Sequence, residues 1–120
     1  MKAHTFTPYD FEIFKARVLE LVDKFAMHDW HITVLHEQIG SGVSAQTQYD
    51  TVAKNACVRL TINTEGDYGL VWDAERLATH EMLHLLLADF CTACCTLHDP
   101  LHTMVVGAEH AALNRLMRVI

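Results

Sequence analysis

The segment His80-Glu81-Met82-Leu83-His84, inside an apolar run from Leu77 to Phe90, constrains this chain more than any other feature. On a helix, residues four apart lie on one face about one turn from each other, so His80 and His84 can bind a single metal ion. Zinc binds neutral imidazole nitrogens, and a catalytic site keeps one position open for a water that a neighbouring carboxylate deprotonates. We therefore predict Zn²⁺ on these histidines, with Glu81 as the general base. The other interpretation is a chance motif whose histidines serve packing, since the chain has nine histidines in 120 residues.

The third metal ligand must come from residues downstream of this motif. Between residues 103 and 120, apolar residues recur at helical spacing. Glu109 projects near the middle of that apolar stripe, whereas His110 projects near its edge. A carboxylate there is costly unless a metal ion, or a buried Arg or His, pairs with it. These positions favour Glu109 as the ligand. The full set of candidates is Asp89, His98, His102, Glu109 and His110.

An HExxH sequence on one helix, followed by a Glu on a later helix, resembles the gluzincin clan of zinc metallopeptidases. Its compact single-domain members, and small phage or prophage proteins of the same pattern, have about this length. The resemblance implies that His80, His84 and Glu109 bind zinc and that Glu81 is the general base. It covers roughly residues 28 to 120 in layout, and the HExxH is its specific part.

Two positions depart from the patterns of related clans. The metzincins have a third histidine six residues after the second, where this chain has Phe90. The better-known gluzincins place an acidic residue four after the ligand Glu, where it orients a histidine, and this chain has Leu113 there. Asn114 and His110 are the residues that can substitute for that acid.

Length and composition set broad limits on the fold and the partners. A chain of 120 residues with 51% hydrophobic residues predicts one domain, residues 1–120, with a sizeable core. Neither a membrane span nor a signal peptide is expected, so we predict a cytoplasmic protein that does not bind membranes. Four cysteines in such a chain indicate reduced thiols or metal ligands. A net charge of −6 without a Lys/Arg cluster argues against nucleic acid as a partner.

The first half of the chain predicts one helix and three strands. Thr7 is a capping residue and Pro8 suits the first helical position, so a helix is expected over residues 7–27. Alternating patterns predict strands over residues 30–38, 43–50 and 56–63, as an antiparallel hairpin or meander against that helix. A mixed sheet is the other possibility, and the two would place different strands at the edges.

The second half predicts the motif helix, a loop and a closing helix. Asp73 is a plausible cap for a buried helix that runs to about Phe90. The segment from Cys91 to Pro100 is expected to be an irregular loop with reduced thiols. A second, structural zinc site is the less favoured alternative there, with Cys91, Cys94, Cys95 and His98 as its ligands.

These inferences predict an α+β, minimal zincin-like domain that hydrolyses peptide bonds. Zinc would polarise the scissile carbonyl, Glu81 would take the proton of the zinc-bound water, and an exposed strand edge would hold a peptide or protein substrate extended. Two other classes remain open. One is an inactive binding module on the same scaffold, which Leu113 makes more credible, and the other is a zinc hydrolase with non-peptide substrates.

Overall fold

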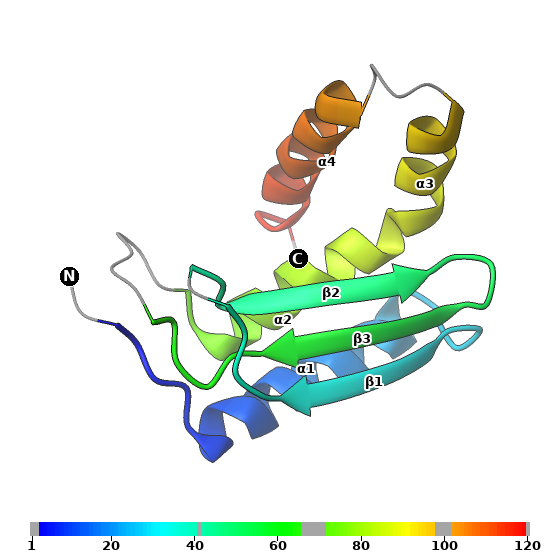
Figure 1. The fold of residues 1–120 in the computed structure, drawn as a ribbon. Coiled ribbons are helices and arrows are strands. Elements are labelled where there is room, and N and C mark those ends of the chain that lie inside the picture. The colour runs from blue at the N-terminus through cyan, green and yellow to red at the C-terminus, as the bar shows by residue number, and fades with distance from the viewer. Residues whose placement is uncertain (1–2, 41, 66–71, 98–101, 120) are drawn as a thin grey trace.

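Four helices and a small mixed sheet make up the part of the chain that the structure describes (Figure 1). The computed structural model describes residues 3–40, 42–65, 72–97 and 102–119, without the side chains of residues 93–97 and 102–105. The predicted α+β class is confirmed. The elements, in order, are α1 (Pro8–Lys24), β1 (His31–His36), β2 (Ala45–Asp50), β3 (Asn55–Leu60), α2 (Ala74–Leu86), α3 (Ala88–Leu97) and α4 (His102–Leu116).

The sheet has the order β1-β3-β2, so the last strand in sequence lies in the middle. β1 runs parallel to β3, with Val34 opposite Val58, and β2 runs antiparallel to β3, with Thr47 opposite the same residue. The predicted meander is wrong and the mixed sheet is correct. The tight turn between β2 and β3, in which Lys54 has φ 58°, makes these two strands antiparallel neighbours, and β1 then pairs with the other side of β3.

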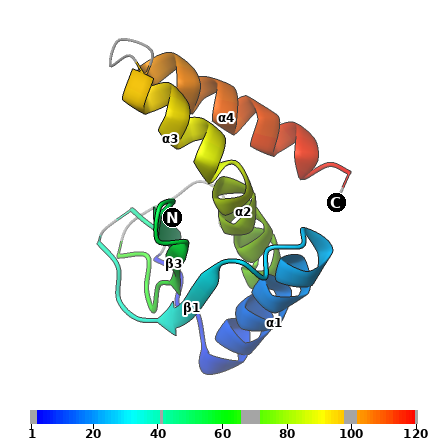
Figure 2. The same ribbon diagram turned by 90° about the vertical axis from the view of Figure 1, so that its right-hand side faces the viewer.

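One face of the sheet is covered by α1 and α2, which lie side by side (Figure 2). Inward-facing strand residues such as Ala56, Val58 and Leu60 are buried beneath these helices. From the helices, Phe14 and Met82 enter the same core with no exposed surface. Burial of this apolar surface is what holds the two helices on the sheet. In the described residues, no helix is long and apolar enough to cross a bilayer.

Helix α1 begins as its sequence predicts. Thr7 is the N-cap, and its Oγ1 accepts a hydrogen bond from the backbone N–H of Asp10 at 3.1 Å. The Asp10 carboxylate in return accepts from the Thr7 N–H at 2.8 Å, and Pro8 occupies the first turn. This capping box satisfies backbone donors that a helix start otherwise leaves without partners.

The predicted motif helix divides into two helices. α2 starts after its predicted cap, since Asp73 accepts from the Arg76 N–H at 2.8 Å, but it ends at Leu86 instead of Phe90. At Leu87 the backbone takes φ −92° and ψ 4°, and α3 departs in a new direction to pack against α4 (Figure 1). Phe90 is consequently 62% exposed and not buried as predicted.

Residues 91–97 are helical, so the predicted irregular loop is wrong for this stretch. Cysteine is only a moderate helix former, but the segment contains no glycine or proline before Pro100, so nothing in it interrupts a helix. Cys91 is buried at 6% exposure. The alternative second zinc site cannot be built from what is described, because His98 and the side chains of Cys94 and Cys95 lie outside it.

The third strand is shorter than predicted. It ends at Leu60, and the alternation then breaks, so that Thr61 is fully buried while Ile62 is 43% exposed. The hydroxyl of Thr61 accepts from the Ile39 N–H at 3.1 Å and donates to the carbonyl of Asn63 at 3.0 Å. These bonds satisfy a buried polar group where the chain leaves the sheet.

Candidate metal centre

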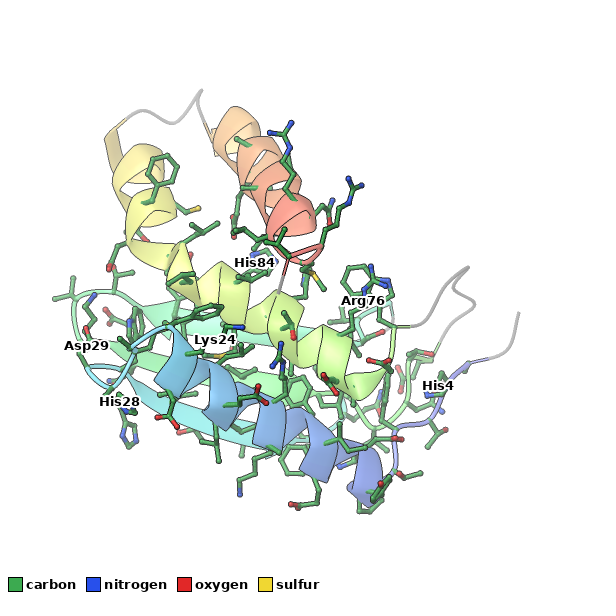
Figure 3. The ribbon with its side chains drawn as sticks, turned by 180° about the vertical axis from the view of Figure 1, so that it is seen from behind. His4, Lys24, His28, Asp29, Arg76 and His84 are labelled. Carbon is green, nitrogen blue, oxygen red and sulfur yellow. The ribbon has the colours of Figure 1, made fainter. Side chains whose placement is uncertain are left out.

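Helix α2 is held between α1, β2 and α4, which orients its histidines. On the α1 side, Nε of Arg17 donates to Oγ1 of Thr79 at 3.1 Å, and Leu85 is 1% exposed in the core. The opposite side carries His84, which points toward α4 (Figure 3). The amphipathic pattern of α2 thus buries one face and leaves the histidine face for α4 to cover.

Three imidazole rings gather where α2 meets α4. The ring centroids of His80 and His84 are 4.7 Å apart, and His110 of α4 lies 5.2 Å from His84 and 6.1 Å from His80. One nitrogen of each ring lies within 4.8 Å of those of the other two. His80 and His84 are partly buried and His110 is exposed, so the cluster opens to solvent on the α4 side. Nitrogens at this separation can hold one metal ion.

Glu109, the third ligand predicted from the sequence, also reaches this cluster. Its Oε1 makes a hydrogen bond with Nδ1 of His84. The Glu109 side chain is 12% exposed, and its partly buried partner His84 is of the kind that the sequence left as an alternative to a metal ion. Glu109 and His110 are neighbours on α4, and the structure brings both to the motif histidines.

Glu81 is buried beside the histidines and is held from two sides. Its side chain is 8% exposed. Oε1 accepts from the hydroxyl of Thr47 at 2.9 Å, and Oε2 lies 3.1 Å from Nδ1 of His80. A carboxylate with these partners has a fixed orientation, which is what a general base needs. Thr47 was not among the predicted site residues, although it is the polar side chain on the otherwise apolar side of its strand.

The ring of Trp72 packs against the ring of His80 and restrains its orientation. The edge of one ring meets the face of the other, with centroids 5.3 Å apart and an interplanar angle of 74°. The guanidinium of Arg76 in turn lies over the Trp72 ring, 4.4 Å from its centroid. Such contacts restrict the imidazole before any ligand binds.

Among the other predicted candidates for a third ligand, Asp89 is the one whose side chain is described, and it does not join the cluster. Oδ2 of Asp89 pairs with Nζ of Lys54 at 2.8 Å, on the side of the β2–β3 turn. His98 and the side chain of His102 lie outside the described residues. His31 is exposed, and His36 stacks on Phe11 with ring centroids 5.1 Å apart, so these two histidines lie on the surface and in packing contacts and not in the cluster.

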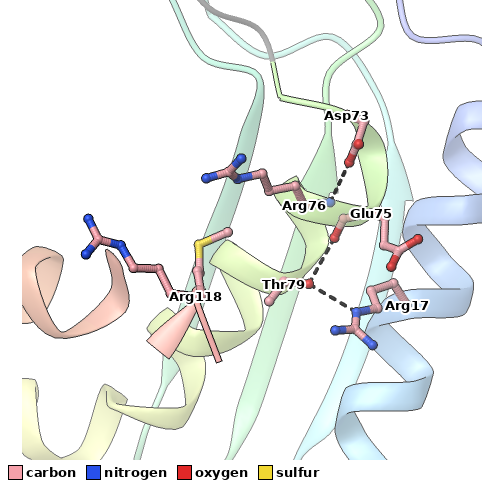
Figure 4. A pocket seen from close by; sticks show the side chains of 7 residues that line it. Arg17, Asp73, Glu75, Arg76, Thr79 and Arg118 are labelled. Atoms are coloured by element: carbon pink, nitrogen blue, oxygen red, sulfur yellow. Dashed lines mark hydrogen bonds between the residues drawn. The ribbon is translucent and has the colours of Figure 1, made fainter. Parts of the chain in front are cut away.

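A cavity of about 400 Å³ lies near the start of α2 (Figure 4). Arg17 of α1, Arg76 of α2 and Arg118 beyond α4 contribute to its lining, together with acidic Asp73 and Glu75. None of the clustered histidines, nor Glu81 or Glu109, lines it. The cavity is therefore separate from the histidine cluster and its two carboxylates.

No protein-family model matches this chain, and no match is found among curated proteins or solved structures. The interpretation of the site thus depends on its own chemistry. Imidazole nitrogens and carboxylate oxygens, three or more of them converging around an open side, are the donors that zinc uses in catalytic sites. The residues present fit that metal.

Proposed function

We propose that this chain is a zinc-dependent peptidase that uses Glu81 as its general base. The observation that carries the proposal is the buried Glu81 carboxylate, fixed by Thr47 beside a cluster of imidazoles that fits a metal ion. His80 and His84 would hold the metal, and the sequence pattern adds Glu109. The HExxH likeness to gluzincins supports the same assignment.

When bound, zinc supplies a Lewis acid that polarises the scissile carbonyl and lowers the pKa of a water molecule. Glu81 would take a proton from the water while the oxygen of that water attacks the carbonyl carbon. The new C–O bond forms and the C–N bond then breaks, and Glu81 passes its proton to the departing amine. The hydrogen bond from the Thr47 hydroxyl to Oε1 would hold the carboxylate in one orientation, while Oε2 would turn from Nδ1 of His80 to the water.

The substrate would be a peptide held in extended form along β2. This strand is an edge of the sheet and packs against α2, whereas the other edge, β1, packs against α1. An open strand edge binds extended peptides through main-chain hydrogen bonds. Thr47 lies on β2 itself, so a peptide on this edge would pass close to Glu81. The proposal retains the cytoplasmic location expected from the sequence.

One observation favours a second candidate, a binding module without turnover. Leu113, at the position of the acid in better-known gluzincins, is fully buried in the α4 interface and orients no histidine. Both oxygens of Glu81 are also engaged within the protein. A scaffold that binds metal or a partner without cleavage would have these same features.

Cleavage of a peptide library by the purified zinc-loaded chain separates the two candidates. Glu81→Gln preserves shape and removes the base, so it should retain zinc and lose about 10²-fold or more of the rate. Glu75→Gln is the matched control, since Glu75 is exposed on the same helix and should keep full activity. Absence of zinc-dependent cleavage by the wild type, or equal rates for Glu81→Gln and the control, would exclude the peptidase.

A further inference from the structure

We propose that His110 is the third metal ligand and that Glu109 acts one step removed, by orienting His84. This inference rests on the proposed function, because it assigns ligands to the same centre. It differs from the sequence-based set of His80, His84 and Glu109. The two sets use adjacent residues of α4, and the hydrogen bonds around the rings distinguish them.

The bond between His84 and Glu109 occupies the nitrogen that faces the carboxylate. An ionised Glu109 carboxylate can only accept, so in this bond Nδ1 of His84 carries the proton and donates it to Oε1. A protonated ring nitrogen has no lone pair for a metal. His84 is therefore left with Nε2 as its ligand atom. A metal-bound histidine whose other nitrogen donates to a carboxylate is a common arrangement, and the carboxylate sets the tautomer and the ring direction.

His80 has the same arrangement one turn earlier on α2. Its Nδ1 lies 3.1 Å from Oε2 of Glu81, a hydrogen-bond distance, and the Trp72 edge packs against its ring. Both motif histidines thus have a carboxylate on Nδ1 and direct Nε2 elsewhere. A third donor therefore has to reach the Nε2 atoms of these two rings.

His110 meets that requirement. Its ligand atom belongs to the one group of three or more potential metal ligands found among the described residues, with His80 and His84. Ligand nitrogens in a tetrahedral zinc site, at about 2.0–2.1 Å from the ion, are about 3.3 Å apart. One nitrogen from each of the three rings lies within 4.8 Å of the other two, so side-chain rotation would have to draw them closer around an ion. Because His110 is exposed, its side of the ion remains open to water and substrate.

Metal binding by single variants of the whole chain tests this assignment. Zinc affinity would be measured by competition with a chromophoric chelator, and the number of imidazole ligands by X-ray absorption. The wild type should bind one zinc with three imidazoles. His110→Ala should bind with two imidazoles and a greatly reduced affinity, while Glu109→Gln should keep three imidazoles and lose about 10- to 100-fold in affinity.

The matched control is Arg115→Gln, exposed on the same helix and not among the proposed ligands or their partners, which should bind zinc as the wild type does. Circular dichroism verifies the fold of each variant. Either of two results would overturn the ligand assignment and leave the proposed function standing. The first is three imidazoles and unchanged affinity in His110→Ala. The second is two imidazoles in the wild type together with loss of zinc in Glu109→Gln. A wild type that binds no zinc would overturn the proposed function as well.

Discussion

The hydroxyl of Thr47 in β2 donates to Oε1 of Glu81 in α2 at 2.9 Å, and so joins the edge strand of the sheet to the motif helix. The same hydroxyl lies 3.4 Å from the main-chain carbonyl of Glu81. Two elements that are distant in sequence thereby fix one buried carboxylate. The strand proposed to hold the substrate is also the strand that positions the proposed base.

Thr47→Val should lower the peptidase rate without removing zinc. Valine keeps the shape of threonine but leaves Oε1 of Glu81 without its donor. A hydrogen bond to a charged group is worth about 1.5–3 kcal/mol, so kcat should fall by about 10-fold or more. Thr33→Val, on the exposed side of β1, is the control and should retain the wild-type kcat. Equal kcat for both variants would mean that Thr47 does not position the base.

Zinc should stabilise the folded chain, because the cluster exists only when α2 and α4 are packed together. A free zinc concentration about 1,000-fold above Kd adds about 4 kcal/mol to the free energy of unfolding, which raises Tm on the order of 10 °C. His84→Ala should abolish the shift. His28→Ala should preserve it, since His28 is 68% exposed and pairs with Asp23 at 2.9 Å. A shift that survives in His84→Ala would assign the zinc to other residues.

Two adjacent leucines at the end of α2 should differ sharply in their effect on stability. Leu85 is 1% exposed and Leu86 is 40% exposed. Leu85→Ala should cost about 2–5 kcal/mol, because it leaves a cavity between the helix and the sheet. Leu86→Ala should cost about 1 kcal/mol or less. Urea unfolding measures both, and comparable losses would contradict the described rotation of α2.

The sequence by itself determined the features that depend on neighbours along the chain. The helix repeat of 3.6 residues puts His80 and His84 on one face wherever the helix lies, and the Thr7 and Asp73 caps act within their own first turns. The α+β class also followed from local patterns. Each of these depends on contacts between residues only a few positions apart.

Only the tertiary structure decided the order of the strands, the bend at Leu87 and the contacts of Thr47. Alternation of apolar and polar residues predicts that a segment is a strand but not which strand it pairs with. In this sheet β3 lies between the other two strands. The roles proposed for Glu109 and His110 likewise depend on how α4 rotates against α2. That rotation depends on the packing of α4, including the buried Leu113, against residues that are distant in the sequence. Because Glu109 and His110 are adjacent, their spacing along the helix does not show which of them faces the motif histidines.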